Sequence, residues 1–294
     1  MFRILATAFA ALAGLAFGSF LNVCLTRWPQ GESVALPGSH CRNCNRMLAW
    51  WENVPLASWV ALRGRCRTCH AWIGCRYPLV ECAVGALWAI AAWNSTSMAV
   101  SGDLLGAGVH AIGKMIFFWL LIGLAALDAE HLWLPDWLTL PGIGLGVVYA
   151  IASAYFRARG LSFDTLRSPS MAVLHAALST ALAILFAAGI ILLIRGIYWL
   201  MRRREGIGLG DAKLMALLAA WLGFSRALLA LGLGVVLGAL AALVLLALPS
   251  ARKSGDSWSA TKLPLGTFLC VGGIAASLWG NGMIAAYLRW AGFR

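Results

Sequence analysis

Residues 115–128 read MIFFWLLIGLAALD, an unbroken apolar run that ends at the carboxylate of Asp128. A second acid, Asp211, follows the glycine-rich string GIGLG (206–210) and opens the next apolar segment. A carboxylate at membrane depth costs about 2.5–3.5 kcal/mol on insertion scales, so it is a candidate functional residue. If the two segments face each other, the two aspartates form an acid/base pair beside the bilayer.

The composition indicates a membrane protein. Hydrophobic residues make up 61% of the 294 residues and charged residues only 12%, against about 45–50% and about 25% in soluble domains. The net charge of +12 does not indicate nucleic-acid binding, because the basic residues lie in short loops between apolar runs, as orientation signals do. The first apolar run lacks an A-x-A-like cleavage site, so we expect a retained helix.

Apolar runs broken by charge or by Pro and Gly predict an all-α polytopic membrane protein with about eight transmembrane helices. We expect three parts: a first transmembrane helix (1–26), a cysteine-containing cytoplasmic insertion (27–78) and a multi-helix membrane core (79–294). The predicted spans are 4–26, 79–94, 111–127, 137–155, 172–194, 212–224, 226–248 and 265–288.

Lysine and arginine in the loops predict the orientation. Loop 27–78 is rich in arginine, whereas loop 95–110 has no Lys or Arg. The positive-inside rule and alternation of the spans place loops 27–78, 128–136, 195–211 and 249–263 in the cytoplasm. Alternation puts loop 156–171 outside, despite its three arginines. Asp128 and Asp211 are then both expected at the cytoplasmic ends of their spans.

Four of the eight cysteines form two CxxC pairs, CRNC (41–44) and CRTC (66–69). Four thiolates at this spacing can close a tetrahedral structural Zn(II) site, as in zinc ribbons. Metal would stabilise a loop that has little core of its own. Disulfides, which the cytoplasm disfavours, and a redox CxxC remain as alternatives. The expected ligands are Cys41, Cys44, Cys66 and Cys69. His40 and His70 are neighbours that could substitute, and Cys75 is close enough to be mistaken for a ligand.

In the string GLGDAKL (208–214), Asp211 is the residue that makes the pattern indicative of a functional site. GIGLG also occurs at 142–146 inside a predicted span, where no acid follows and the glycines are typical of helix packing. Before Asp211, the glycines allow close backbone approach and place the carboxylate at a helix start, where the dipole favours the anion. Lys213 can pair with an acid or extend to lipid phosphates, and Asp136 is expected as a helix cap. The supporting residues are Gly208, Gly210 and Lys213.

At these residues the chain resembles the bacterial prepilin peptidases, or type IV leader peptidases, a branch of the GxGD aspartyl proteases. The resemblance covers nearly the whole chain and implies that Asp128 and Asp211 are the catalytic dyad of a membrane peptidase core. One departure is PLGTFL (264–269), where Thr267 stands in place of the second proline of a Pro-Phe-Gly-Pro-like stretch. Besides the CxxC pairs, the matching motifs are FGSFLNV (17–23), ENVPLASW (52–59), RGRC (63–66), RYPLVE (76–81), LPD (134–136) and GLGDAKL (208–214).

The resemblance implies an enzyme of the bacterial inner membrane. Members of the family cut the basic leader from type IV prepilins or from the pseudopilins of type II secretion. Many of them then methylate the new amino terminus with S-adenosylmethionine. In such a dyad two close carboxylates share one proton: one activates water, and the other polarises the scissile carbonyl and protonates the leaving amine. The candidate residues for methyl transfer are Glu52, Arg76 and Glu81, which could instead form ion pairs or anchor the chain at the interface.

Two other functions remain open at this stage. In an ion- or proton-coupled transporter the aspartates would be ion or proton ligands, but the sequence has no evident inverted repeat. In a membrane-tethered zinc-ribbon interaction protein the aspartates would be structural, which leaves GLGDAKL unexplained.

Overall fold

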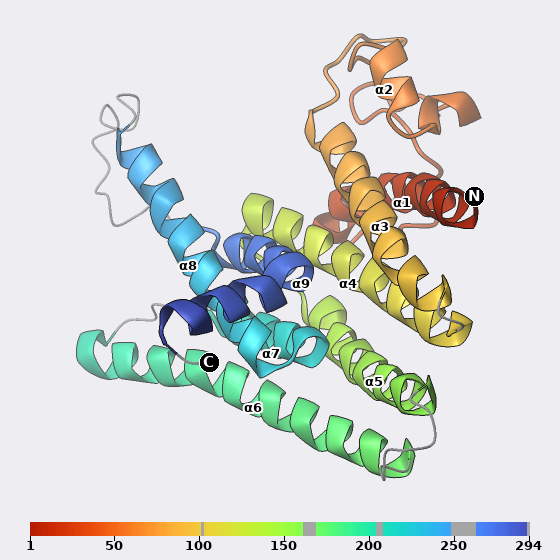
Figure 1. Cartoon of the computed structure of the whole chain (residues 1–294). Helices are drawn as coiled ribbons and strands as arrows, with labels where there is room; N and C mark the ends of the chain where they lie inside the picture. Colours follow the sequence, from red (N-terminus) through yellow and green to blue (C-terminus); the bar gives the residue numbers. More distant parts are fainter. Residues whose placement is uncertain (101–102, 161–168, 204–207, 248–262, 293–294) are drawn as a thin grey trace. The chain divides into compact units, whose positions relative to one another are not determined.

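The computed structural model describes residues 1–100, 103–160, 169–203, 208–247 and 263–292 (Figure 1). Every regular element in these ranges is helical, apart from two isolated β-bridges, so the all-α expectation is confirmed. The chain forms two compact units, Met1–Gly123 and Leu124–Arg294.

The first unit is organised around two long helices that pack closely. It contains α1 (Phe2–Arg27), η1 (Trp28–Gln30), η2 (Trp50–Asn53), α2 (Ala57–Ala61), α3 (Arg76–Val100) and the first part of α4 (Leu104–His131). Glycines on α1 permit the close approach: a Cβ at Gly14 would lie 2.8 Å from the Cα of Gly85, and one at Gly18 would lie 2.8 Å from the Cα of Glu81. The start of α3 is therefore held against α1.

The second unit surrounds a short central helix, α7 (Leu209–Leu222). It also contains the last turns of α4 and the helices α5 (Asp136–Gly160), α6 (Pro169–Arg202), α8 (Phe224–Ala247) and α9 (Leu265–Trp290). Helix α7 contacts α5, α6, α8 and α9, and every residue from Leu214 to Leu222 is buried. A helix that is apolar on all sides is buried in a protein interior or in a membrane, and α7 is buried by its neighbours.

Within the described residues, six helices are long and apolar enough to cross a membrane: α1 with η1, α4, α5, α6, α8 and α9. The expected number of about eight spans is not confirmed. The predicted span 212–224 corresponds to α7, whose 14 residues extend about 21 Å, less than the ~30 Å hydrocarbon core. The predicted span 79–94 corresponds to α3, which is not among the six.

Several helices end later than the sequence predicted, and α4 and α6 are examples. Helix α4 continues through His131, so Asp128 lies within its last turn, and α6 continues through Arg202. At the end of α6, the long arginine side chains can reach the polar interface, so a charge does not have to end that helix. Residues 161–168 and 248–262, which include most of loop 249–263, lie outside the described residues, and the membrane orientation stays a prediction.

Candidate functional site

Asp128 is a buried carboxylate, 6% exposed, tied to the start of α9. Its Oδ2 accepts a hydrogen bond from the backbone N–H of Thr267 at 2.7 Å. The Thr267 hydroxyl oxygen lies 3.2 Å from the same Oδ2 and 3.0 Å from the carbonyl oxygen of Ala125, and its proton can be donated to either. The N–H and the hydroxyl of Thr267 both lie next to Oδ2 and hold the orientation of the carboxylate.

Asp211 lies in the first turn of α7. Its Oδ2 accepts a hydrogen bond of 3.3 Å from the N–H of Gly208, the residue that precedes the helix. Gly210 sits against the loop between α4 and α5, because a Cβ there would lie 3.2 Å from the Cβ of Leu134. A larger residue than glycine at position 210 would therefore have to displace Leu134 by a few tenths of an ångström, next to the carboxylate.

The two aspartates meet within the second unit. They interact electrostatically with each other, and both act on the buried thiol of Cys270. Gly266 closes the site from α9, since a Cβ there would lie 2.9 Å from Asp128 Oδ2 and 3.0 Å from the Cδ1 of Leu134. The structure thus brings two acids, distant in sequence, close enough to interact electrostatically beside the buried Cys270.

A salt bridge lies close to Asp211 in the sequence. The Lys213 ammonium is 2.5 Å from Asp136 Oδ1, and both side chains are partly exposed. Asp136, expected as a cap, is thus an ion-pair partner at the first residue of α5. Of the two roles open to Lys213, the structure shows pairing with an acid.

The four cysteines of the CxxC pairs converge in the first unit. The Sγ atoms of Cys41 and Cys69 are 3.7 Å apart, and those of Cys44 and Cys66 are 4.0 Å apart. All four lie within 4.8 Å of one another. Four sulfurs bound at ~2.3 Å around a tetrahedral Zn(II) are about 3.8 Å apart. The thiols are free and their spacing exceeds the ~2.05 Å of a disulfide, so the set fits a metal.

The two CxxC turns have the same backbone geometry. In each turn, the carbonyl of the first cysteine, Cys41 or Cys66, accepts a hydrogen bond from the N–H four residues later. These donors, Asn45 and His70, both have φ of +55°. Hydrogen bonds from the backbone N–H groups of Cys69 and Thr68 lower the pKa of Cys66 to about 6. A thiol that ionises readily is suited to bind metal.

The three residues considered for methyl transfer have different surroundings, all in the first unit. Glu52 is buried, and both oxygens of its carboxylate accept hydrogen bonds. Two come from Arg46, at 2.6 and 3.0 Å, and a third comes from the N–H of Ala49. Arg46 lowers the pKa of Glu52 below its ordinary value.

The other two residues lie at the first turns of α3. Arg76 donates a 2.7 Å hydrogen bond to the Thr26 hydroxyl and lies over the ring of Tyr77. Glu81 is buried, 6% exposed, and accepts a hydrogen bond from the N–H of Leu56.

Sequence reasoning missed three residues that surround the aspartates: Thr267, Gly266 and Leu134. Thr267 was recognised only as a departure from the family pattern. Its position next to Asp128 depends on the packing of α9 beside the end of α4, which no local pattern encodes. The signal that could have identified it is chemical, since threonine supplies an N–H and a hydroxyl where proline supplies neither.

Comparisons with known proteins identify the family of the chain. Residues 12–95 match the bacterial peptidase A24 N-terminal domain, and residues 115–243 match the type IV leader peptidase family. The prepilin leader peptidase/N-methyltransferase of Stutzerimonas stutzeri is 32% identical, over 96% of this chain and 93% of its own length. The protein of the same name from Pseudomonas aeruginosa gives the same values. That from Klebsiella pneumoniae is 35% identical over 74% of this chain and 85% of its own. No solved structure matches the chain significantly. The chain therefore belongs to the type IV leader peptidase family.

Proposed function

We propose that this chain is a multi-pass inner-membrane aspartyl endopeptidase that removes the basic leader from type IV prepilins or type II secretion pseudopilins. Asp128 and Asp211 are its catalytic dyad. The observation that carries the proposal is the electrostatic interaction between these two carboxylates, with Asp128 buried. The same enzyme methylates the new amino terminus, as the names of its relatives indicate.

The dyad divides the chemistry between its two carboxylates. The ionised carboxylate takes a proton from water, whose oxygen attacks the scissile carbonyl carbon. The protonated carboxylate donates to the carbonyl oxygen, and the leaving amine receives a proton as the carbon–nitrogen bond breaks. The Thr267 N–H orients Asp128 and the Gly208 N–H orients Asp211. Because the two acids share a proton, their titration belongs to the pair.

The site fits a substrate that is partly in the membrane. A prepilin keeps its basic leader in the cytoplasm and its apolar helix in the bilayer, so the scissile bond falls at the cytoplasmic interface. Both acids lie at helix ends, Asp128 in the last turn of α4 and Asp211 in the first turn of α7. We therefore assign the active site to the cytoplasmic face.

The three parts of the chain have separate roles in this proposal. Residues 1–26 anchor the chain, residues 27–78 form a module held by a structural Zn(II), and residues 79–294 form the peptidase core. Cys41, Cys44, Cys66 and Cys69 would hold the metal, which would join the two CxxC turns. When bound, S-adenosylmethionine supplies an electrophilic methyl group, and the candidates that serve it are Glu52, Arg76 and Glu81.

The test is co-expression of the chain with a prepilin. Asp128→Asn and Asp211→Asn should each abolish the band shift of leader removal, because asparagine keeps the shape of aspartate but cannot exchange the required proton. Asp136→Asn, which removes a carboxylate outside the dyad, is the matched control and should still cleave. Mass spectrometry of the product's amino terminus reports methylation separately. Cleavage at the wild-type rate by either dyad variant contradicts the assignment.

The transporter alternative has no support from the relatives, which are named as peptidases and methyltransferases. Loss of leader cleavage in both dyad variants would argue against it directly.

A further inference from the structure

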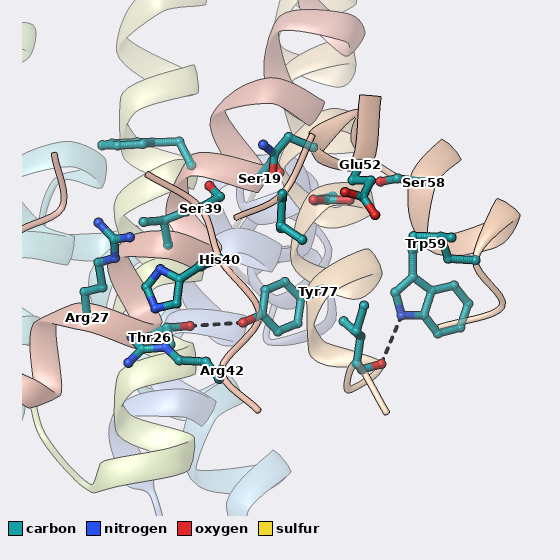
Figure 2. A pocket seen from close by; sticks show the side chains of 17 residues that line it. Ser19, Thr26, Arg27, Ser39, His40, Arg42, Glu52, Ser58, Trp59 and Tyr77 are labelled. Carbon is teal, nitrogen blue, oxygen red and sulfur yellow. Dashed lines mark hydrogen bonds between the residues drawn. The ribbon is translucent and has the colours of Figure 1, made fainter. Parts of the chain in front are cut away.

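The first unit contains a cavity of about 380 Å³ between the end of α1, the cysteine-containing segment and the start of α3 (Figure 2). Its volume lies within the ~300–1,000 Å³ range of small-molecule sites. In Figure 2 the basic side chains of Arg27, His40 and Arg42 lie toward one end, and Glu52 lies toward the other. A ligand that carries both signs of charge would match this arrangement.

One acid on the cavity wall differs from the other charged groups there. Glu52 is paired with Arg46, and Arg42 is paired with Glu32 at 2.8 Å. The guanidinium of Arg27 donates to three backbone carbonyls. Glu81 accepts one hydrogen bond of 2.8 Å from the N–H of Leu56, and within the described parts of the chain no cation forms an ion pair with it.

Buried carboxylates in proteins are normally paired with a positive charge or fully hydrogen-bonded. Because Glu81 borders the cavity, a ligand can supply that charge. The neutral N–H of Leu56 satisfies only part of the acceptor capacity of the carboxylate.

The backbone on both sides of Glu81 is arranged to hold it there. Leu56 has φ of +59°, an unfavourable conformation for a residue with a branched side chain, and in this conformation its N–H donates to Glu81. On the other side, Gly18 of α1 lies against the Cα of Glu81, where any side chain would clash. Strain of this kind persists where the surrounding structure requires it, often at ligand sites.

Two aromatic side chains complete the cavity, and hydrogen bonds fix both (Figure 2). The Trp59 indole N–H donates to the carbonyl of Ile73 at 3.1 Å, and the Tyr77 hydroxyl is 3.3 Å from the Thr26 hydroxyl. Aromatic faces attract sulfonium and ammonium cations and stack on nucleobases. The cavity therefore favours a ligand that combines a flat heterocycle with a positive charge.

We propose that this cavity binds the methyl donor S-adenosylmethionine and that Glu81 is the counter-ion of its positive end. This inference rests on the proposed methyl transfer and separates the three candidate residues. Glu81 contacts the donor, whereas Glu52 holds Arg46 in the cysteine-containing segment and Arg76 positions Thr26 and Tyr77.

Direct binding tests the inference without an activity assay. Full-length protein in nanodiscs is titrated with S-adenosylmethionine by calorimetry. Glu81→Gln should raise Kd about 10- to 100-fold, the usual effect of losing a charged hydrogen bond. Asp103→Asn is the matched control, because Asp103 caps the start of α4 and does not line the cavity. Its Kd should be unchanged.

Titration with S-adenosylhomocysteine, which lacks the sulfonium charge, locates the contact. A loss restricted to S-adenosylmethionine assigns Glu81 to the sulfonium. An equal loss for both ligands assigns it to the amino group, and both results support the inference. An unchanged Kd for Glu81→Gln overturns it.

Two further measurements keep the test decisive. Zinc content and thermal unfolding show whether Glu81→Gln is folded. If it is not, Ser19→Leu decides, because this variant fills the cavity from α1 and leaves the carboxylate in place. Ser19→Leu should also weaken binding about tenfold or more, and an unchanged Kd refutes the site. If the wild-type protein binds no S-adenosylmethionine and its product is not methylated, the proposed methyl transfer itself is refuted. Leader cleavage is measured independently, so that part of the proposed function would not be affected.

Discussion

Replacing Gly266 by alanine should disable the dyad while leaving the fold intact. The added methyl carbon would lie 2.9 Å from Asp128 Oδ2, 3.0 Å from its Cγ and 3.0 Å from the Cδ1 of Leu134. Ordinary contacts of this kind begin near 3.4 Å, so the carboxylate must retreat by about half an ångström. The retreat also lengthens its 2.7 Å hydrogen bond from Thr267.

The expected magnitude follows from this displacement. A misplacement of ~1 Å in a catalytic group costs about 10²-fold in rate, so we expect kcat/KM for leader cleavage to fall about 10- to 100-fold. The strain falls mainly on two side chains that can rotate, and the overpacking penalty of about 1–3 kcal/mol is partly offset by the ~1 kcal/mol helix preference of alanine over glycine. The variant should therefore remain folded.

The assay is cleavage of a purified prepilin by the full-length enzyme in detergent, with thermal unfolding measured on the same samples. Gly282→Ala is the matched control, because it lies on the same helix, α9, and no described atom approaches its new methyl group within 4 Å. The reasoning is refuted if Gly266→Ala cleaves as fast as Gly282→Ala.

Three other predictions concern the metal, the salt bridge near the dyad and acid stability. Cys66→Ala should lower the zinc content measured by elemental analysis, whereas Cys75→Ala should not, and zinc-free active protein would contradict the metal site. Asp136→Asn breaks an exposed ion pair with Lys213, so it should cost about 0.2–1 kcal/mol in thermal unfolding, and a much larger loss would assign the pair a structural role. The arginine partner of Glu52 lowers its pKa from 4.5 in the folded protein, so its contribution to stability is complete above about pH 4.5 and fades below it. The gap in unfolding temperature between wild type and Glu52→Gln should therefore shrink only in acid, and a constant gap from pH 7 to 3 would contradict this.

Among the described residues, the sequence predicted the positions of eight apolar helices, one of them short, because each depends on local composition. Apolar runs, glycines and loop charges marked where each helix begins and ends, usually to within a few residues. The predictions were wrong about helix length and helix ends. Helix α7 is helical but too short to be a span, and α4 and α6 continue past the charged residues that were expected to end them.

The aspartates themselves could be identified from the sequence, but their surroundings could not. Asp136 was expected to cap a helix, a local role, whereas its ion-pair partner Lys213 lies on another helix. In the same way, Thr267 reaches Asp128 only because α9 packs beside the end of α4. Glu52 and Glu81 look equivalent as buried acids in matching motifs, and only their partners distinguish a saturated carboxylate from one with remaining acceptor capacity.

The side chain of Leu134 bears on the distance between the two segments that position the aspartates. It lies against the positions where Gly210 and Gly266 would carry a Cβ. The side chain of Leu134 therefore separates the residue before Asp211 from the residue before Thr267. Two acids that share a proton need a fixed gap, and a charged group could not set it without disturbing their titration. In the proposed dyad, Leu134 would be an uncharged spacer, and the connection between α4 and α5 would set the separation of the two acids. Changes in the volume of this one side chain should therefore tune the spacing of the acids without altering either of them.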